Sequence, residues 1–189
     1  MADKSQLRRV TLFALRLTII TPVVLALWWW AMPVYARGIG HVAALVLRVM
    51  GYPIERVVVI ASGFLNTDTT LGFTLGGSIP TAPISWVVTN VAIYISLILA
   101  THSMNWRRRA RALAIGLATL LAAHIAHIIV FFAFAPAIER NPQVPTAIAQ
   151  ILITLPFLLW IVLAYWTGPA FLPAQGEDST SQFHSEATT

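Results

Sequence analysis

The strongest constraint on the fold of this chain is a series of apolar stretches with the length of a membrane-spanning helix. About 20 apolar residues are needed to cross the hydrocarbon core of a bilayer as a helix. Four segments reach or approach that length: residues 10–35, 83–101, 112–135 and 147–166. Only 10% of the 189 residues are charged, against roughly 25% in soluble domains. The sequence therefore predicts an integral membrane protein of the all-α class with four transmembrane helices.

The segment between the first two spans, residues 36–82, is expected to lie on the extracytoplasmic side. Residues 37–51 have helical periodicity in a stretch too short to span, which predicts an amphipathic helix on the membrane surface. Six residues form its apolar stripe: Ile39, Val42, Ala43, Val46, Leu47 and Met50. Residues 55–77 begin with β-branched residues, contain turn residues and end in glycines, which predicts a small β element of two or three short strands.

The positive charges predict the orientation of the chain. Lys4, Arg8 and Arg9 precede the first span, and four arginines separate the second span from the third: Arg107, Arg108, Arg109 and Arg111. By the positive-inside rule, residues 1–9 and 102–111 are cytoplasmic, and the loop at residues 136–146 is outside. Residues 167–189 are polar and rich in Ser and Thr, which predicts a disordered cytoplasmic tail. We expect a multi-pass protein of the cell inner (plasma) membrane with both termini in the cytoplasm.

Two other interpretations of these basic and apolar segments are less favoured. A cleavable signal peptide would explain "VYA" before Arg37, but the apolar stretch is longer than an ordinary signal sequence. The net charge of +5 would suit nucleic acid, but topology accounts for the arginines, which we expect to contact anionic lipid head groups instead. The chain has no cysteine, which excludes disulfides, thiolate ligands and a Cys nucleophile.

Two histidines, His124 and His127, lie three residues apart in the apolar run of the third span. A rise of about 1.5 Å per residue places them near the depth of polar residues in the second and fourth spans. Polar side chains in lipid face the bundle interior and bond to one another. The sequence therefore predicts an intramembrane polar layer made of His124, His127, Asn90, Thr89, Thr154 and Gln150.

This layer is interpreted first as a set of hydrogen bonds that fixes helix register, with an outward-opening pocket as an alternative. A metal or haem at His124 and His127 is less favoured, because two histidines normally need a carboxylate or a third His, and no span contains an acidic residue. Ser85 and Thr89 are nucleophile types, but nothing in the sequence activates them. We therefore expect no cofactor and no catalytic residue.

The segment "VVTNVAIYISLILATHSMNWRRRARALAIGLATLLAAHIAHI", residues 87–128, resembles the central helical hairpin of the exosortase/archaeosortase family. These multi-pass membrane enzymes process sorting signals of exported proteins, with a catalytic Cys near the outer end of one helix and an Asn-x-x-Arg motif on the next. The Cys region corresponds to the neighbourhood of Thr89 and Asn90, and the Asn-x-x-Arg spacing falls on residues 124–127. Both the Cys and the Arg are absent, so the resemblance implies the hairpin and not the peptidase activity.

In layout the whole chain is similar to exosortase H-associated membrane proteins, which share the first span, the outer β-like segment and three later spans. The sequence thus favours a non-enzymatic protein, accessory to an envelope sorting, export or assembly system. Its expected partners are membrane lipids and a membrane protein bound through residues 52–82. The alternative is a membrane enzyme or redox subunit that uses His124 and His127 as acid–base groups or cofactor ligands. A small transporter ranks last, because neither a clear midplane ionisable residue nor internal repeats are evident.

Overall fold

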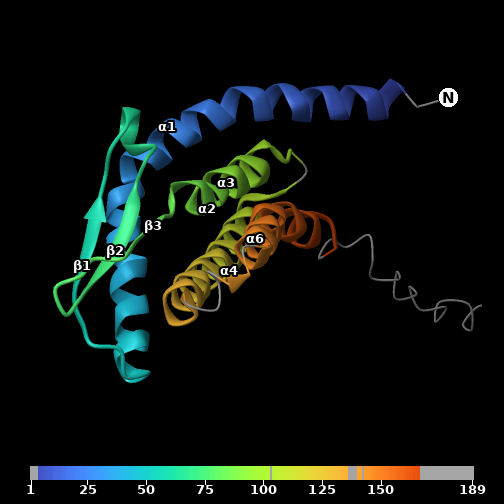
Figure 1. The fold of residues 1–189 in the computed structure, drawn as a ribbon. Coiled ribbons are helices and arrows are strands. Elements are labelled where there is room, and N and C mark those ends of the chain that lie inside the picture. Colours follow the sequence, from blue (N-terminus) through green and yellow to red (C-terminus); the bar gives the residue numbers. More distant parts are fainter. Residues whose placement is uncertain (1–3, 103, 136–139, 142, 167–189) are drawn as a thin grey trace, which may run out of the picture.

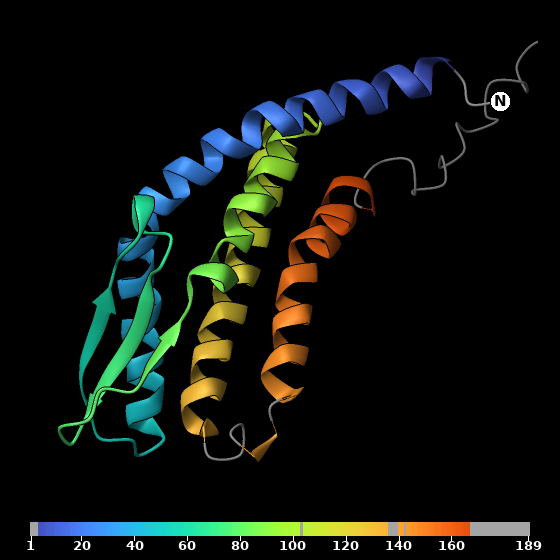
Figure 2. The same ribbon diagram turned by 45° about the horizontal axis from the view of Figure 1, so that its top comes forward.

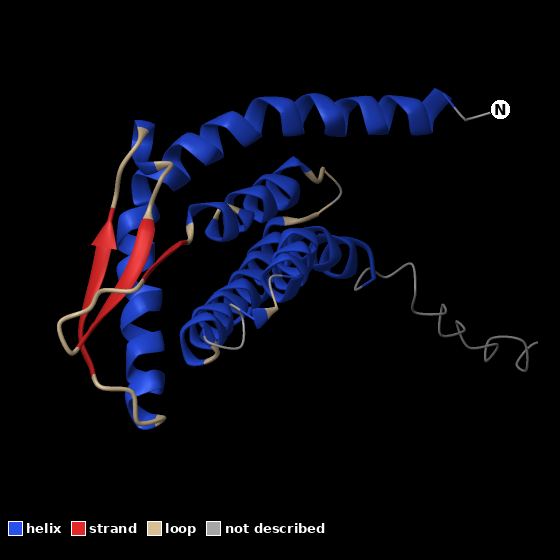
Figure 3. Cartoon of the chain, in the orientation of Figure 1, coloured by secondary structure: helices blue, strands red, loops and turns tan. Residues whose placement is uncertain are grey.

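The computed structural model describes residues 4–102, 104–135, 140–141 and 143–166 and is mainly helical with one small sheet (Figures 1 and 3). In chain order the elements are α1 (Lys4–Val49), β1 (Ile54–Ile60), the 3-10 turn η1 (Phe64–Asn66), β2 (Thr70–Leu75), β3 (Thr81–Pro83), α2 (Ser85–Val88), α3 (Asn90–Ala100), α4 (Trp106–Ala133), α6 (Gln143–Ile161) and the π-helical turn η2 (Val162–Trp166). The predicted tail, residues 167–189, and much of the predicted outer loop lie outside the described residues.

The first helix, α1, continues through the boundary that the sequence suggested near residue 36. It is 46 residues long and contains Pro22 and Pro33. A proline inside a helix removes a backbone N–H and bends the helix, and Figures 1 and 2 show that α1 changes direction along its length. The predicted amphipathic segment is therefore a continuation of the first helix, because the glycines at 38 and 40 keep helical backbone angles and nothing else breaks the chain.

One face of α1 is buried along its second half. The buried residues recur every three or four positions, as expected for one helix face: Met32, Ala36, Ile39, Ala43, Ala44 and Leu47. Three of the predicted stripe residues, Val42, Val46 and Met50, are exposed instead. The buried stripe of α1 is therefore narrower than the apolar stripe that the sequence predicts.

The predicted β element is a three-stranded antiparallel sheet in the order β1–β2–β3 (Figure 3). A two-residue turn at Gly76 and Gly77 allows β2 to turn back, since both residues have positive φ angles of 52° and 89°. Such turns require φ > 0 at both central positions, which glycine adopts without steric cost. The prediction of two or three short strands is thus confirmed.

The inner face of the sheet packs on helices of the same chain. Val57, Leu71 and Phe73 belong to an apolar cluster with the second half of α1. The Phe73 ring meets Phe132 of α4 at a centroid distance of 4.6 Å. The sheet therefore lies against the C-terminal end of α4, opposite the end that carries the arginines.

The predicted second span differs in its start and in its length. Pro83 lies in β3 rather than at the first helical position, and the helix begins at Ser85. Together α2 and α3 form an apolar helical segment, Ser85–Ala100, which at about 1.5 Å per residue is roughly 24 Å long. That length is below the roughly 30 Å hydrocarbon core of a bilayer, so spanning by this segment stays a prediction.

Three of the described helices are long and apolar enough to cross a membrane: Leu7–Val49, Trp106–Ala133 and Ala147–Ala164. They meet in two apolar clusters. One cluster joins the second half of α1, the sheet and the C-terminal half of α4. The other joins α3, the N-terminal half of α4 and the end of α6.

A close approach between α3 and α4 depends on a glycine. The Tyr94 hydroxyl of α3 donates to the Ala112 carbonyl of α4 at 2.6 Å, and Tyr94 is fully buried. A Cβ atom at Gly116, one turn beyond Ala112, would overlap the Tyr94 ring. Small residues spaced by four allow helices to approach closely in this way.

We expect Gly116→Val to lower the free energy of unfolding by about 1–3 kcal/mol, the range of overpacked core sites. Thermal unfolding of the purified chain in detergent measures the effect. Gly38→Ala is the matched control, because no atom lies within 4 Å of a Cβ placed there, and it should leave stability unchanged or slightly higher. Equal stability of Gly116→Val and the parent chain would contradict the close α3–α4 contact.

Candidate functional site

The partner of His124 is Tyr35 of α1. The Tyr35 hydroxyl and His124 Nδ1 lie 2.9 Å apart, and the two rings meet edge to face with a centroid distance of 6.0 Å. His124 is only 1% exposed. A tyrosine hydroxyl is the natural donor to an imidazole nitrogen, which would leave the proton of His124 on Nε2. This histidine, which lies in an apolar run of α4, is therefore held by a hydrogen bond to another helix, α1.

The second nitrogen of His124 is not satisfied in the same way. Its Nε2 is buried and has no hydrogen-bond partner in the described structure. Trp28 Nε1 is likewise buried and unpaired there, and the Trp28 ring packs on Tyr35 at 4.9 Å. The junction of α1, α2 and α4 thus contains polar N–H groups in apolar surroundings.

His127 lies one turn beyond His124 and contacts two aromatic rings. Its ring centroid is 6.4 Å from that of Trp86 and 6.3 Å from that of Phe131. Its Nδ1 is buried without a hydrogen-bond partner among the described residues. His127 therefore does not share the bond that His124 makes with α1.

The other four predicted members of the polar layer have separate partners. Asn90 is 2% exposed and donates through Nδ2 to the Leu152 carbonyl at 2.6 Å, which ties α3 to α6. Thr89 donates to the Ser85 carbonyl one turn before it. Thr154 is exposed and bonds within its own helix to the carbonyls of Gln150 and Ile151, and Gln150 is exposed as well. The structure therefore brings the two histidines together but does not unite the six residues in one hydrogen-bonded set.

Tyr35 is the residue that the sequence did not single out. Tyr35 ends the aromatic-rich stretch "WWWAMPVY", residues 28–35, and Trp30 is the one strongly exposed aromatic residue in it, at 74%. Trp28 and Tyr35 are seven residues apart and so share a helix face, the face that continues into the buried stripe of α1. The seven-residue spacing is the sequence signal that would have identified Trp28 and Tyr35 as residues that face the other helices.

The described residues contain no group of three or more His, Asp or Glu side chains placed to hold a metal ion. The nucleophile types also lack an activating base: Thr89 donates to the Ser85 backbone within its own helix. Within the described part of the chain, the residues near His124 and His127 are aromatic and aliphatic. The hydrogen bond between Tyr35 and His124 can fix the position of α1 relative to α4 in these apolar surroundings, which is a structural role.

The arginines of the basic loop, residues 102–111, bond the ends of neighbouring helices at the N-terminal end of α4. Arg109 Nη2 donates to the Thr101 carbonyl at the end of α3, and Arg108 Nη2 donates to the Ala164 carbonyl in η2, both at 2.7 Å. The Asn105 side chain caps α4 by accepting from the Arg108 backbone N–H at 2.9 Å. Two of the four predicted lipid-contacting arginines thus also hold helix ends together.

The loop between β1 and β2 presents a third candidate site. Phe64 is 81% exposed and Leu65 has φ 53° and ψ 33°, a left-handed conformation that is rare for a branched side chain. Asn66 follows with φ 64° and donates to the Trp29 carbonyl at 3.4 Å. The loop is closed by two bonds between Ser62 and the backbone of Asp68, each 3.0 Å long.

No family model matches the chain, and no curated protein or solved structure is significantly similar to it.

The bond between Tyr35 and His124 predicts a measurable coupling. Tyr35→Phe or His124→Leu alone should cost about 1–3 kcal/mol, since each leaves a buried polar group unpaired. The double variant should cost less than the sum by about 0.6–1.7 kcal/mol, the range for bonds between membrane helices. Equilibrium unfolding in detergent of the parent, the two single variants and the double variant measures this difference.

Tyr35→Phe combined with His127→Leu is the control cycle, because Tyr35 and His127 share no hydrogen bond in the described structure. Its coupling should be near zero. Equal coupling in the two cycles would mean that the Tyr35–His124 bond is not specific.

Proposed function

We propose that this chain is a non-enzymatic membrane protein, accessory to an envelope system that sorts, exports or assembles proteins. The three membrane-length helices support the membrane placement. The resemblance of residues 87–128 to the exosortase hairpin, without its catalytic Cys and Arg, suggests an exosortase-type enzyme as the class of partner. The sheet and the loop between β1 and β2 would form the surface that contacts it on the extracytoplasmic side.

The observation that carries this proposal is the strained, exposed loop Gly63–Thr69. A left-handed leucine costs roughly 1–2 kcal/mol relative to an ordinary conformation, and glycine would adopt the same angles without that cost. Backbone strain of this kind is concentrated at binding sites, where the rest of the structure holds it in place. Here the strained backbone presents Phe64 and Leu65 on the outside of the molecule.

The loop is held firmly enough to act as a preformed surface. Gly63 has φ 77°, and a Cβ atom there would overlap the side chains of Thr67 and Asp68. Thr69 is fully buried and donates to the Asn66 carbonyl at 2.8 Å. A preformed apolar loop loses little conformational freedom on binding, which favours affinity.

The sheet adds an open edge beside this loop. Among the described residues β1 pairs only with β2, which leaves the backbone groups on its other side for a partner strand. Arg48 of α1 already bonds the carbonyls of Ile54 and Glu55 at 2.8 and 3.2 Å, which leaves the Val57–Ile60 part of the edge for pairing. Lipid hydrocarbon cannot satisfy such groups, whereas water or a protein strand can.

The orientation is tested with single cysteines, for which the cysteine-free chain is already a clean background. Glu55→Cys on the sheet should react with a membrane-impermeant maleimide on intact cells from which any outer barrier has been removed. Ala110→Cys in the basic loop should react only after permeabilisation. Both side chains are exposed, so burial does not account for a difference. Reaction of Ala110→Cys alone on intact cells would reverse the proposed orientation.

The partner surface is tested with Leu65→Gly and Phe64→Asp. Leu65→Gly should keep or raise stability by up to about 1 kcal/mol, because it relieves the left-handed strain, and yet it should lose partner contact. A photoreactive phenylalanine at position 64 should form an adduct with one envelope membrane protein, identified by mass spectrometry. The same group at Trp106, which is 73% exposed at the other end, is the control.

In cells that lack the chain, the parent should restore the normal set of exported proteins, measured by quantitative proteomics, and both loop variants should fail. Full restoration by Leu65→Gly and Phe64→Asp would contradict the proposal. A folded, partner-bound chain carrying His124→Leu and His127→Leu that failed to restore export would show that the histidines do more than pack.

A further inference from the structure

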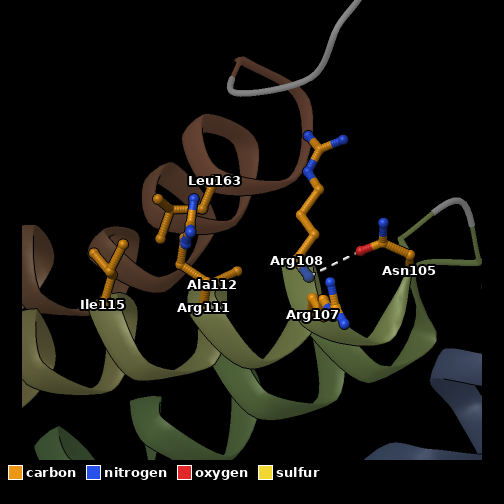
Figure 4. A pocket seen from close by; sticks show the side chains of 7 residues that line it. All are labelled: Asn105, Arg107, Arg108, Arg111, Ala112, Ile115 and Leu163. Atoms are coloured by element: carbon orange, nitrogen blue, oxygen red, sulfur yellow. Dashed lines mark hydrogen bonds between the residues drawn. The ribbon is translucent and has the colours of Figure 1, made fainter.

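The first turns of α4 and the η2 turn line a cavity of about 360 Å³ (Figure 4). Its polar lining comes from Asn105, Arg107, Arg108 and Arg111, and its apolar lining includes Ile115 and Leu163. The volume is near the lower end of the range for small-molecule sites, about 300–1,000 Å³. Three guanidinium groups thus surround one opening between two helices.

No carboxylate in the described structure neutralises these cations. The acidic residues of that part of the chain are Glu55 in β1 and Asp68 in the loop before β2, and neither lines the cavity. Arg108 keeps a buried Nε without a partner, although its Nη2 bonds the Ala164 carbonyl. Within the described residues, Arg107 and Arg111 make no hydrogen bond or ion pair. The cavity therefore has an excess of positive charge and free donors.

The lining changes from cationic to apolar along one helix face. Arg108, Arg111 and Ile115 are spaced by three and four residues and so share one side of α4. Ile115 is 46% exposed, and Leu163 of η2 lines the same cavity. An anionic group at the arginines would thus have an apolar surface one turn away, toward the middle of the helix.

We propose that this cavity binds the phosphate of an anionic glycerophospholipid, with an acyl chain lying against Ile115 and Leu163. Arginine presents paired N–H donors that match phosphate oxygens, and basic pockets between helices on the cytoplasmic side are suited to such head groups. The inference rests on the proposed membrane placement. It assigns three of the four basic-loop arginines to the lipid site. Arg109 is not among them, because its guanidinium bonds the Thr101 carbonyl and does not line the cavity.

The test uses the purified full-length chain in detergent with added phosphatidylglycerol or phosphatidylcholine. Lipid adducts are counted by native mass spectrometry, and the shift of the melting temperature gives the apparent affinity. The parent should prefer phosphatidylglycerol. Arg107→Gln with Arg111→Gln should weaken that binding about thirty-fold, since each arginine near an anionic head group contributes roughly a factor of five.

Arg8→Gln with Arg9→Gln is the matched control, because it removes the same charge from exposed positions on α1. It should retain the preference for phosphatidylglycerol. An equal loss of phosphatidylglycerol affinity in this control would show that the effect depends on net charge alone, and it would overturn the proposed site. Circular dichroism and size exclusion of both double variants show whether each one is folded, and Arg107 and Arg111 can be changed singly if the pair is not.

Three outcomes identify other occupants and would each overturn the proposal. Inorganic phosphate that stabilises the chain as well as the lipid does would indicate a site for a soluble phosphate. Binding of phosphatidylglycerol only after Glu177→Gln, Asp178→Asn and Glu186→Gln would indicate that the acidic C-terminal segment fills the cavity. No preference between the two lipids would indicate no head-group site. Carbonate extraction of host membranes tests the membrane placement separately.

Discussion

The fold depends on the point where α1 meets α4, which is held by the bond between Tyr35 and His124. Trp28 and Tyr35 pack against both apolar clusters, the one with the sheet and the one with α3 and α6. In lipid, apolar side chains gain little by contacting one another rather than acyl chains. A directional bond at this junction therefore fixes the rotation and the height of α1 more effectively than additional apolar contacts would.

The contact between α1 and α4 also explains how the curved, 46-residue α1 can pack on two parts of the molecule. Prolines at 22 and 33 let α1 bend, so its first half runs across one end of α3 and its second half carries the sheet (Figure 2). At the other end of the bundle, Phe13 stacks on Trp160 at 5.5 Å, and Trp160 donates to the Thr101 hydroxyl at 2.9 Å. Aromatic and hydrogen-bonded contacts thus fix the positions of the helices relative to one another, whereas uniform apolar packing would allow the helices to slide.

Periodicity and composition were sufficient for three membrane-length helices and for the small sheet, because each depends on local pattern: the apolar runs and the β-branched segment. They were not sufficient for the partners of polar residues. Depth along a span places Thr154 and Asn90 together, but only Asn90 faces the bundle, because rotation about the helix axis is set by tertiary contacts that a count of residues omits. The continuity of α1 was missed for a related reason. Residues 37–51 were predicted to be a separate surface helix because they are too short to span, whereas a single charged, exposed residue such as Arg37 does not break a helix.

The basic loop shows how one charge cluster serves several purposes at once. Lys4 is the only lysine among the 12 Lys and Arg residues of the chain, so the cluster is built from a side chain with several donors in a fixed plane. A lysine would satisfy the positive-inside rule equally well, but it would not present the paired donors of a guanidinium to a carbonyl such as that of Thr101 or Ala164 while leaving N–H groups for an anion. The hydrogen bonds of Arg108 to Ala164 and of Arg109 to Thr101 therefore explain arginine at these two positions beyond what topology requires. The same reasoning separates Arg109, whose guanidinium closes the end of α3, from its neighbours at the cavity.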